Sequence, residues 1–134
     1  MKQNLIILIC IFLFSCVEKS QIPIPNTLEI ALGNKYSDYV SNLNKAYKKD
    51  SSALLKLFKI DYINDAAGYE HGFILYQIMN TYDDKIFSTV LQRLSARELN
   101  TVKLYFEVGI DANDKYKYEM KEHYPLSSNT LQIK

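Results

Sequence analysis

The sequence predicts an all-α fold: a single domain, residues 26–134, packed as a compact bundle of about five or six short helices. Three observations favour this class. From position 26 onward, apolar residues recur at spacings of three and four, the period of an amphipathic helix. Residues that cap helix starts precede several of these apolar stripes. Connections of about two to five residues between the stripes would place consecutive helices roughly antiparallel.

The first expected helix covers residues 27–48. Asn26, with Glu29 three positions later, has the spacing of a capping box. The helix then shows a one-sided stripe of Leu28, Leu32, Tyr36, Tyr39, Val40, Leu43 and Tyr47. Gly33 lies inside this stripe, where glycine costs up to ~1 kcal/mol relative to alanine, so it could divide the helix in two.

Two further helices are expected between residues 50 and 81. Asp50 is placed to cap the first, whose apolar positions are Leu54, Leu55, Leu57 and Phe58. Asn64 or Asp65 would begin the second, with an inner side formed by Tyr69, Phe73, Tyr76, Ile78 and Met79.

The next two helices are bounded by clearer signals. Asp83 and Asp84 precede the wide apolar face of Ile86, Phe87, Val90, Leu91 and Leu94. Ser95 and Glu98 form the clearest capping box in the chain, and Gly109 stands where a C′ glycine would end that helix.

The tail is ambiguous between strand and helix. Tyr116, Tyr118 and Met120 alternate with charged residues, as in a strand. Residues 115–123 nevertheless contain strong helix formers and no Gly or Pro, so a short helix ending before Pro125 is favoured. Beyond Pro125 we expect a loose polar segment, with Leu131 and Ile133 as late contacts.

Residues 51–81 and 83–109 would form two helical hairpins of similar length, which suggests a solenoid-like stack. They share no residue signature, and two units are fewer than the three or more that repeat arrays need. The compact bundle is therefore the favoured arrangement.

The first 15 residues have the layout of a signal peptide. Lys2 is followed by the apolar run 5–14, which is too short to cross a ~30 Å hydrocarbon core as a helix. The run ends in Leu13-Phe14-Ser15-Cys16, which resembles the lipobox of bacterial lipoproteins. This resemblance covers residues 1–16 only.

The resemblance implies that the sulfur of Cys16 carries a diacylglycerol and that the chain is cut before it. Val17 is not the aspartate that resembles an inner-membrane retention signal, which favours the outer membrane. The alternatives are an ordinary cleaved signal or an uncleaved anchor, with Cys16 incidental. Residues 16–25 would form a tether stiffened by Pro23 and Pro25, or would pack along the domain through Ile22 and Ile24.

Composition excludes several classes of function. Removing residues 1–15 from the 134-residue chain leaves 119 residues, with 15 basic and 15 acidic side chains. A neutral chain without a basic run gives no electrostatic footprint for nucleic acid. Cys10 would leave with the signal peptide and Cys16 would carry lipid, so no thiol remains for disulfides, zinc or catalysis. All eleven tyrosines lie in the mature chain, where they would line the margins of the core or, alternatively, a binding face.

The chemistry-bearing residues are few. Glu70, His71, Glu119 and His123 could together bind zinc or relay a proton if the tail folded back, but solvated histidines on polar faces are the favoured interpretation. The residues Asp111, Asn113 and Asp114 lack the central glycine and terminal glutamate of an EF-hand. No phosphate-binding loop, nucleophile elbow or dinucleotide motif is present, so we expect no cofactor and no metal.

Taken together, the sequence predicts a membrane-anchored envelope lipoprotein that binds a protein or peptide and is not an enzyme. The alternatives are a small envelope hydrolase working through the His and Glu cluster, and a structural assembly factor whose bundle oligomerises.

Overall fold

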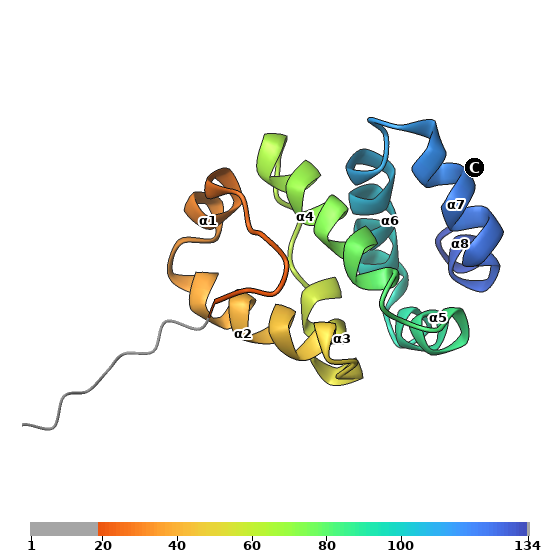
Figure 1. The fold of residues 1–134 in the computed structure, drawn as a ribbon, viewed down its shortest axis with the longest axis horizontal. Coiled ribbons are helices and arrows are strands. Elements are labelled where there is room, and N and C mark those ends of the chain that lie inside the picture. Colours follow the sequence, from red (N-terminus) through yellow and green to blue (C-terminus); the bar gives the residue numbers. More distant parts are fainter. Residues whose placement is uncertain (1–18, 134) are drawn as a thin grey trace, which may run out of the picture.

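The computed structural model describes residues 19–133, and this part of the chain is all-helical (Figure 1). It confirms the predicted all-α bundle. The expected signal peptide and Cys16 lie outside the described residues. The elements are α1 (Asn26–Leu32), the 3₁₀ helix η1 (Gly33–Lys35), α2 (Tyr36–Tyr47), α3 (Ser51–Phe58), α4 (Asp65–Met79), α5 (Asp84–Leu91), α6 (Ala96–Gly109), α7 (Asp114–His123) and α8 (Pro125–Leu131).

Two predicted helix caps are confirmed. The Asp50 carboxylate accepts hydrogen bonds from the backbone N–H groups of Ser52 and Ala53, at 2.8 and 3.0 Å. Ser95 and Glu98 form the full reciprocal capping box of α6. Both caps connect residues three positions apart or fewer, which is why the local sequence sufficed to predict them.

The predicted capping box at Asn26 is wrong, because α1 begins at Asn26 itself. The preceding Pro25 is the cap, and its carbonyl accepts the backbone N–H groups of Leu28 and Glu29. Gly33 ends α1 with φ +53° and ψ −121°, a conformation that side chains with a Cβ rarely adopt. The expected helix 27–48 is therefore divided at this glycine, which is one reason why the described residues form more helices than five or six.

The helices α4 and α6 cross so closely that only glycines fit between them. A Cβ atom added to Gly72 would overlap the carbonyl oxygen of Tyr105, and one added to Gly109 would overlap the backbone of Gly72 and Phe73. We call Gly72 and Gly109 the glycine contact. The helices joined there form the largest helix–helix interface among the described residues and lie at the centre of the bundle (Figure 1).

The glycine contact corrects two predictions. Gly109 was expected as a C′ glycine beyond its helix, but it is the last residue of α6 and serves the close approach to α4. The expected inner side of α4 is confirmed for Tyr76, Ile78 and Met79, which are buried, but it is wrong for Tyr69, which is 37% exposed. The buried face also contains residues that were not predicted: Ala67, Gly68, His71, Gly72, Ile74 and Leu75.

The remaining helices pack on the two sides of this pair. On one side α2 packs against α3, and on the other α5 packs against α8. The predicted hairpin partners α3 and α4 make few contacts with each other, so the solenoid-like alternative does not hold. A cluster of buried aromatic rings links α3, α5 and α6, with Phe58 and Phe106 each edge-to-face against Phe87.

Residues 19–25 pack along the domain, as the alternative to a free tether proposed. Ile22 is buried, and Ile24 is partly buried against the same core. The Asn44 side chain of α2 holds this segment, because its oxygen accepts the backbone N–H of Gln21 and its amide donates to the carbonyl of Lys19. The described part of the expected tether, residues 19–25, is therefore attached to the domain.

The C-terminal tail is helical, which resolves the ambiguity for α7 in favour of the helix. The segment after Pro125 was expected to be loose, and this is wrong, because it forms α8. Its first turn is capped from a distance: the Asp84 carboxylate of α5 accepts the backbone N–H groups of Leu126 and Ser127, at 2.8 and 2.9 Å. Leu131 is buried and Ile133 partly buried, so both expected late contacts are confirmed.

No helix within residues 19–133 combines the length and apolar character that crossing a bilayer requires.

The glycine contact gives a first prediction. Replacing Gly72 with alanine should lower the free energy of unfolding by about 2–3 kcal/mol, because the new methyl group meets backbone atoms that cannot move aside. Urea denaturation followed by circular dichroism measures this loss. Asn100→Ala, at an exposed position of α6, is the control and should change stability by less than about 0.5 kcal/mol. A Gly72→Ala variant as stable as the control would contradict the close crossing.

The distant cap of α8 gives a second prediction. Asp84→Ala removes the acceptor of two backbone N–H groups and of the Ser127 hydroxyl. We expect a loss of about 1–3 kcal/mol, together with faster hydrogen exchange in α8 than in α4. Asn129→Ala, on the exposed side of α8, is the matched control. Unchanged exchange in α8 would show that Asp84 does not hold this helix.

Candidate functional site

The four predicted site residues do not form a single site. The Glu70 carboxylate accepts a hydrogen bond from the Thr27 hydroxyl of α1. The Glu119 carboxylate accepts one from the Tyr76 hydroxyl at 3.0 Å and lies 3.3 Å from the Lys115 ammonium. Within residues 19–133, no group of three or more His, Cys, Asp or Glu side chains is placed to hold a metal ion.

The two histidines differ in their surroundings. His123 is exposed at the end of α7, as expected. His71 is fully buried, which contradicts the expectation of a solvated ring on a polar face. Its Nδ1 lies 2.9 Å from the Tyr39 hydroxyl of α2, and its ring packs edge-to-face on Tyr105 of α6 with centroids 4.5 Å apart. The ring therefore connects three helices in the middle of the bundle.

The buried imidazole is incompletely satisfied. Its Nε2 is buried and has no hydrogen-bond partner. If the Tyr39 hydroxyl donates to Nδ1, the N–H at Nε2 has at most a distorted contact with the Leu57 backbone. If Nδ1 donates instead, the Tyr39 hydroxyl proton needs another partner. Burial lowers the pKa of His71 to about 4, partly offset by the Leu57 backbone, and burial raises the pKa of Tyr39. Both groups are therefore neutral near pH 7.

Tyrosine hydroxyls also position the loop between α3 and α4. The Tyr105 hydroxyl donates to the carbonyl of Asp61 at 2.6 Å and accepts the backbone N–H of Ile63 at 2.8 Å. The Tyr105 side chain therefore packs against His71 with its ring and fixes the backbone of residues 61–63 with its hydroxyl. Other tyrosines, including Tyr62, Tyr69 and Tyr118, are exposed, so the tyrosines serve both the core and the surface.

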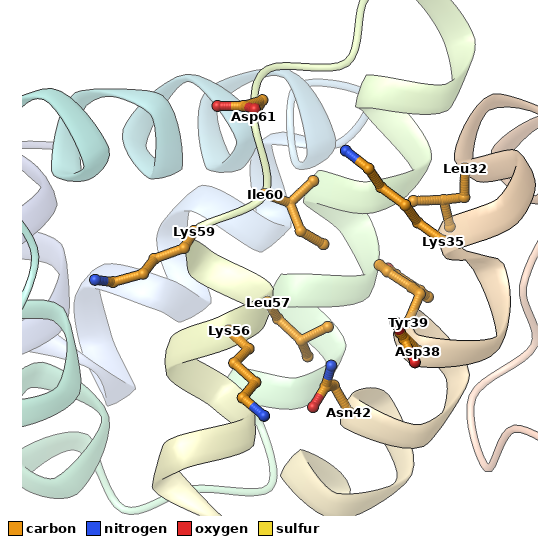
Figure 2. A pocket seen from close by; sticks show the side chains of 10 residues that line it. All are labelled: Leu32, Lys35, Asp38, Tyr39, Asn42, Lys56, Leu57, Lys59, Ile60 and Asp61. Atoms are coloured by element: carbon orange, nitrogen blue, oxygen red, sulfur yellow. The ribbon is translucent and has the colours of Figure 1, made fainter.

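A pocket of about 350 Å³ opens between the η1–α2 segment and α3 (Figure 2). We call it the α2–α3 pocket. Its lining combines apolar, cationic, anionic and amide side chains: Leu32, Lys35, Asp38, Tyr39, Asn42, Lys56, Leu57, Lys59, Ile60 and Asp61. Its volume falls in the range of ~300–1,000 Å³ that is usual for small-ligand sites.

The apolar part of this lining is connected to His71. Tyr39 and Leu57 are both buried, and each contacts both the pocket and the His71 ring. His71 therefore packs against two lining residues but does not itself line the pocket. The hydrogen bond to Nδ1 fixes the orientation of the Tyr39 ring.

The charged groups are distributed around the rim. Lys59 lies 3.3 Å from Glu98 of α6, and Figure 2 shows its side chain directed away from the other lining residues. Within the described part of the chain, Lys35, Lys56, Asp38 and Asp61 form no salt bridge. The rim therefore offers charges of both signs that the protein itself does not neutralise.

Sequence reasoning did not identify this pocket. Tyr39 was placed only in an apolar stripe, and the rim residues lie on two helices whose relative position the sequence does not give. One signal for His71 was available: Gly68 and Gly72 are four residues apart and so share a helix face, and the neighbouring His71 and Leu75 belong to it.

Comparison with known proteins finds no family model, no curated protein and no solved structure that matches this chain.

Because His71 is buried, we expect the folded protein to lose stability as the pH falls. The unfolded chain takes up this proton near pH 6.5, whereas the folded chain takes it up only near pH 4. Between these values the unfolded state binds more protons, so the stability present above pH 6.5 falls as the pH falls, by about 3 kcal/mol at the acid end.

Denaturation curves at a series of pH values test this against two variants. His71→Leu should lack this part of the acid dependence, whereas His123→Gln should keep it. Equal pH slopes for the wild type and His71→Leu would show that the ring is not buried as described.

Proposed function

We propose that this protein is a bacterial lipoprotein anchored by lipid at Cys16, whose helical domain binds a peptide or protein partner in the cell envelope. The observation that carries the proposal is the sequence Leu13-Phe14-Ser15-Cys16 at the end of a short apolar run that follows Lys2. Val17 after the cysteine favours the outer membrane. The lipid anchor is the membrane partner; we propose neither nucleic acid nor a cofactor as a ligand.

The anchor would be strong and short. Two or more acyl chains, at ~0.8 kcal/mol per buried CH₂, give stable membrane attachment. Because Asn44 already holds the backbone at Lys19 and Gln21, few residues separate Cys16 from the domain. At ~3.5 Å per residue the domain would lie within about 20 Å of the lipid. A partner would therefore meet it close to the membrane surface.

A binding role fits the described residues better than a hydrolase. Of the four candidates for acid–base chemistry, Glu119 and His123 lie near each other on α7, whereas Glu70 bonds to Thr27 and His71 to Tyr39. In contrast, the α2–α3 pocket combines an apolar floor with unpaired charges, as binding sites for small ligands do.

Mass spectrometry of the natively expressed protein tests the anchor. The N-terminal peptide of the mature chain should begin at Cys16 and carry the added mass of a diacylglycerol, and the protein should fractionate with membranes. In a Cys16→Ala variant this lipidated peptide should disappear, whereas Cys10→Ala, in the expected leader, should leave it in place. An unmodified thiol at Cys16, or a leader still attached in the wild type, would contradict the proposal.

Cross-linking in intact cells tests the partner, with the protein extracted in mild detergent. We expect a heterologous envelope protein or peptide in the recovered complex. Recovery of the protein alone under several growth conditions would contradict a binding role. Recovery only as a homo-oligomer would favour the assembly factor instead.

A further inference from the structure

We propose that the α2–α3 pocket binds a short zwitterionic peptide, one with a free ammonium group, a free carboxylate and an apolar side chain. This inference rests on the proposed binding function and specifies the chemistry of its ligand.

The floor of the pocket selects an apolar group. Ile60 is the most exposed apolar residue of the lining, because Leu32, Tyr39 and Leu57 are at most 7% exposed. In Figure 2, Leu57 and Ile60 lie in the middle of the lining, between charged side chains. An apolar ligand group placed there would be removed from water, which favours binding in proportion to the area it buries.

The rim selects charges of both signs. Lys35 and Lys56 offer ammonium groups to a carboxylate, and Asp38 and Asp61 offer carboxylates to an ammonium group. A ligand with one sign of charge would be repelled by half of this rim. A zwitterion can satisfy both halves at once, and a peptide with free ends carries its two charges on either side of its side chains.

The size and rigidity of the pocket favour a short ligand. A volume of about 350 Å³ lies at the small end of the range for ligand sites, so the peptide would have about two or three residues. The His71 hydrogen bond holds Tyr39, and the Tyr105 hydroxyl holds the backbone beside Asp61. A preformed site loses less entropy when its ligand binds.

Isothermal titration calorimetry tests the proposal, with the full-length protein purified from whichever cell fraction holds it. The probe is the tripeptide Ala-Leu-Ala, compared with its N-acetylated and C-amidated forms. We expect the free tripeptide to bind and each blocked form to bind at least about tenfold more weakly, since each lacks one charge-assisted contact.

Charge-neutralising variants locate the site. Lys56→Gln and Asp61→Asn should each weaken binding of Ala-Leu-Ala by about tenfold or more. Both positions are exposed, and circular dichroism should show an unchanged fold. Lys45→Gln is the matched control, because it removes one positive charge from an exposed position of α2 that does not line the pocket.

Three results would overturn the proposal: no binding of Ala-Leu-Ala up to about 10 mM, equal binding of the blocked peptides, or an equal effect of Lys45→Gln and Lys56→Gln. If one of these results were found for a protein that is lipidated and has a cross-linked partner, the peptide ligand would be ruled out but the proposed function would not. Peptide binding by a chain without lipid would support the pocket while contradicting the anchor.

Discussion

The rest of the structure depends on the close approach of α4 and α6 at Gly72 and Gly109. Because no side chain separates the two backbones there, Tyr105 of α6 lies directly against His71 of α4. His71 in turn bonds to Tyr39 of α2, and Tyr105 bonds to the loop that follows α3. One backbone contact therefore fixes the relative positions of the two segments, α2 and the end of α3, that form the pocket.

Burying His71 lowers the free energy of unfolding of the domain. Because Nε2 makes no hydrogen bond of ordinary geometry, the buried imidazole does not recover all of its lost solvation, a cost of the order of 1–3 kcal/mol. An apolar residue would avoid this loss but could not hold the Tyr39 hydroxyl. The hydrogen bond to Nδ1 thus holds the Tyr39 side chain in the lining of the α2–α3 pocket at some expense of stability. The proposed lipid at Cys16 would hold the domain, and with it the α2–α3 pocket, close to the membrane.

Features governed by neighbouring residues could be predicted from the sequence, and features governed by distant ones could not. The Asp50 cap and the Ser95–Glu98 capping box were predicted because every partner lies within one helical turn. The helix α8 was missed because its cap, Asp84, is more than 40 residues away. His71 was misplaced because aromatic Tyr69 and Phe73 suggested one inner face, whereas backbone proximity at the glycines selected another. The pocket could not be predicted, because it depends on the angle between α2 and α3, and the spacing of apolar residues gives no information about that angle.

The packing of α2, α4 and α6 around His71 is tested most directly by ¹⁵N nuclear magnetic resonance of the His71 ring in the intact protein. A ring held between Tyr39 and Tyr105 should remain a single neutral tautomer from pH 8 down to about pH 5, since burial lowers its pKa to about 4. Its nitrogen-bound proton should exchange slowly with water. A ring that titrates with an ordinary pKa near 6.5 and exchanges rapidly would show that α2, α4 and α6 do not meet as described.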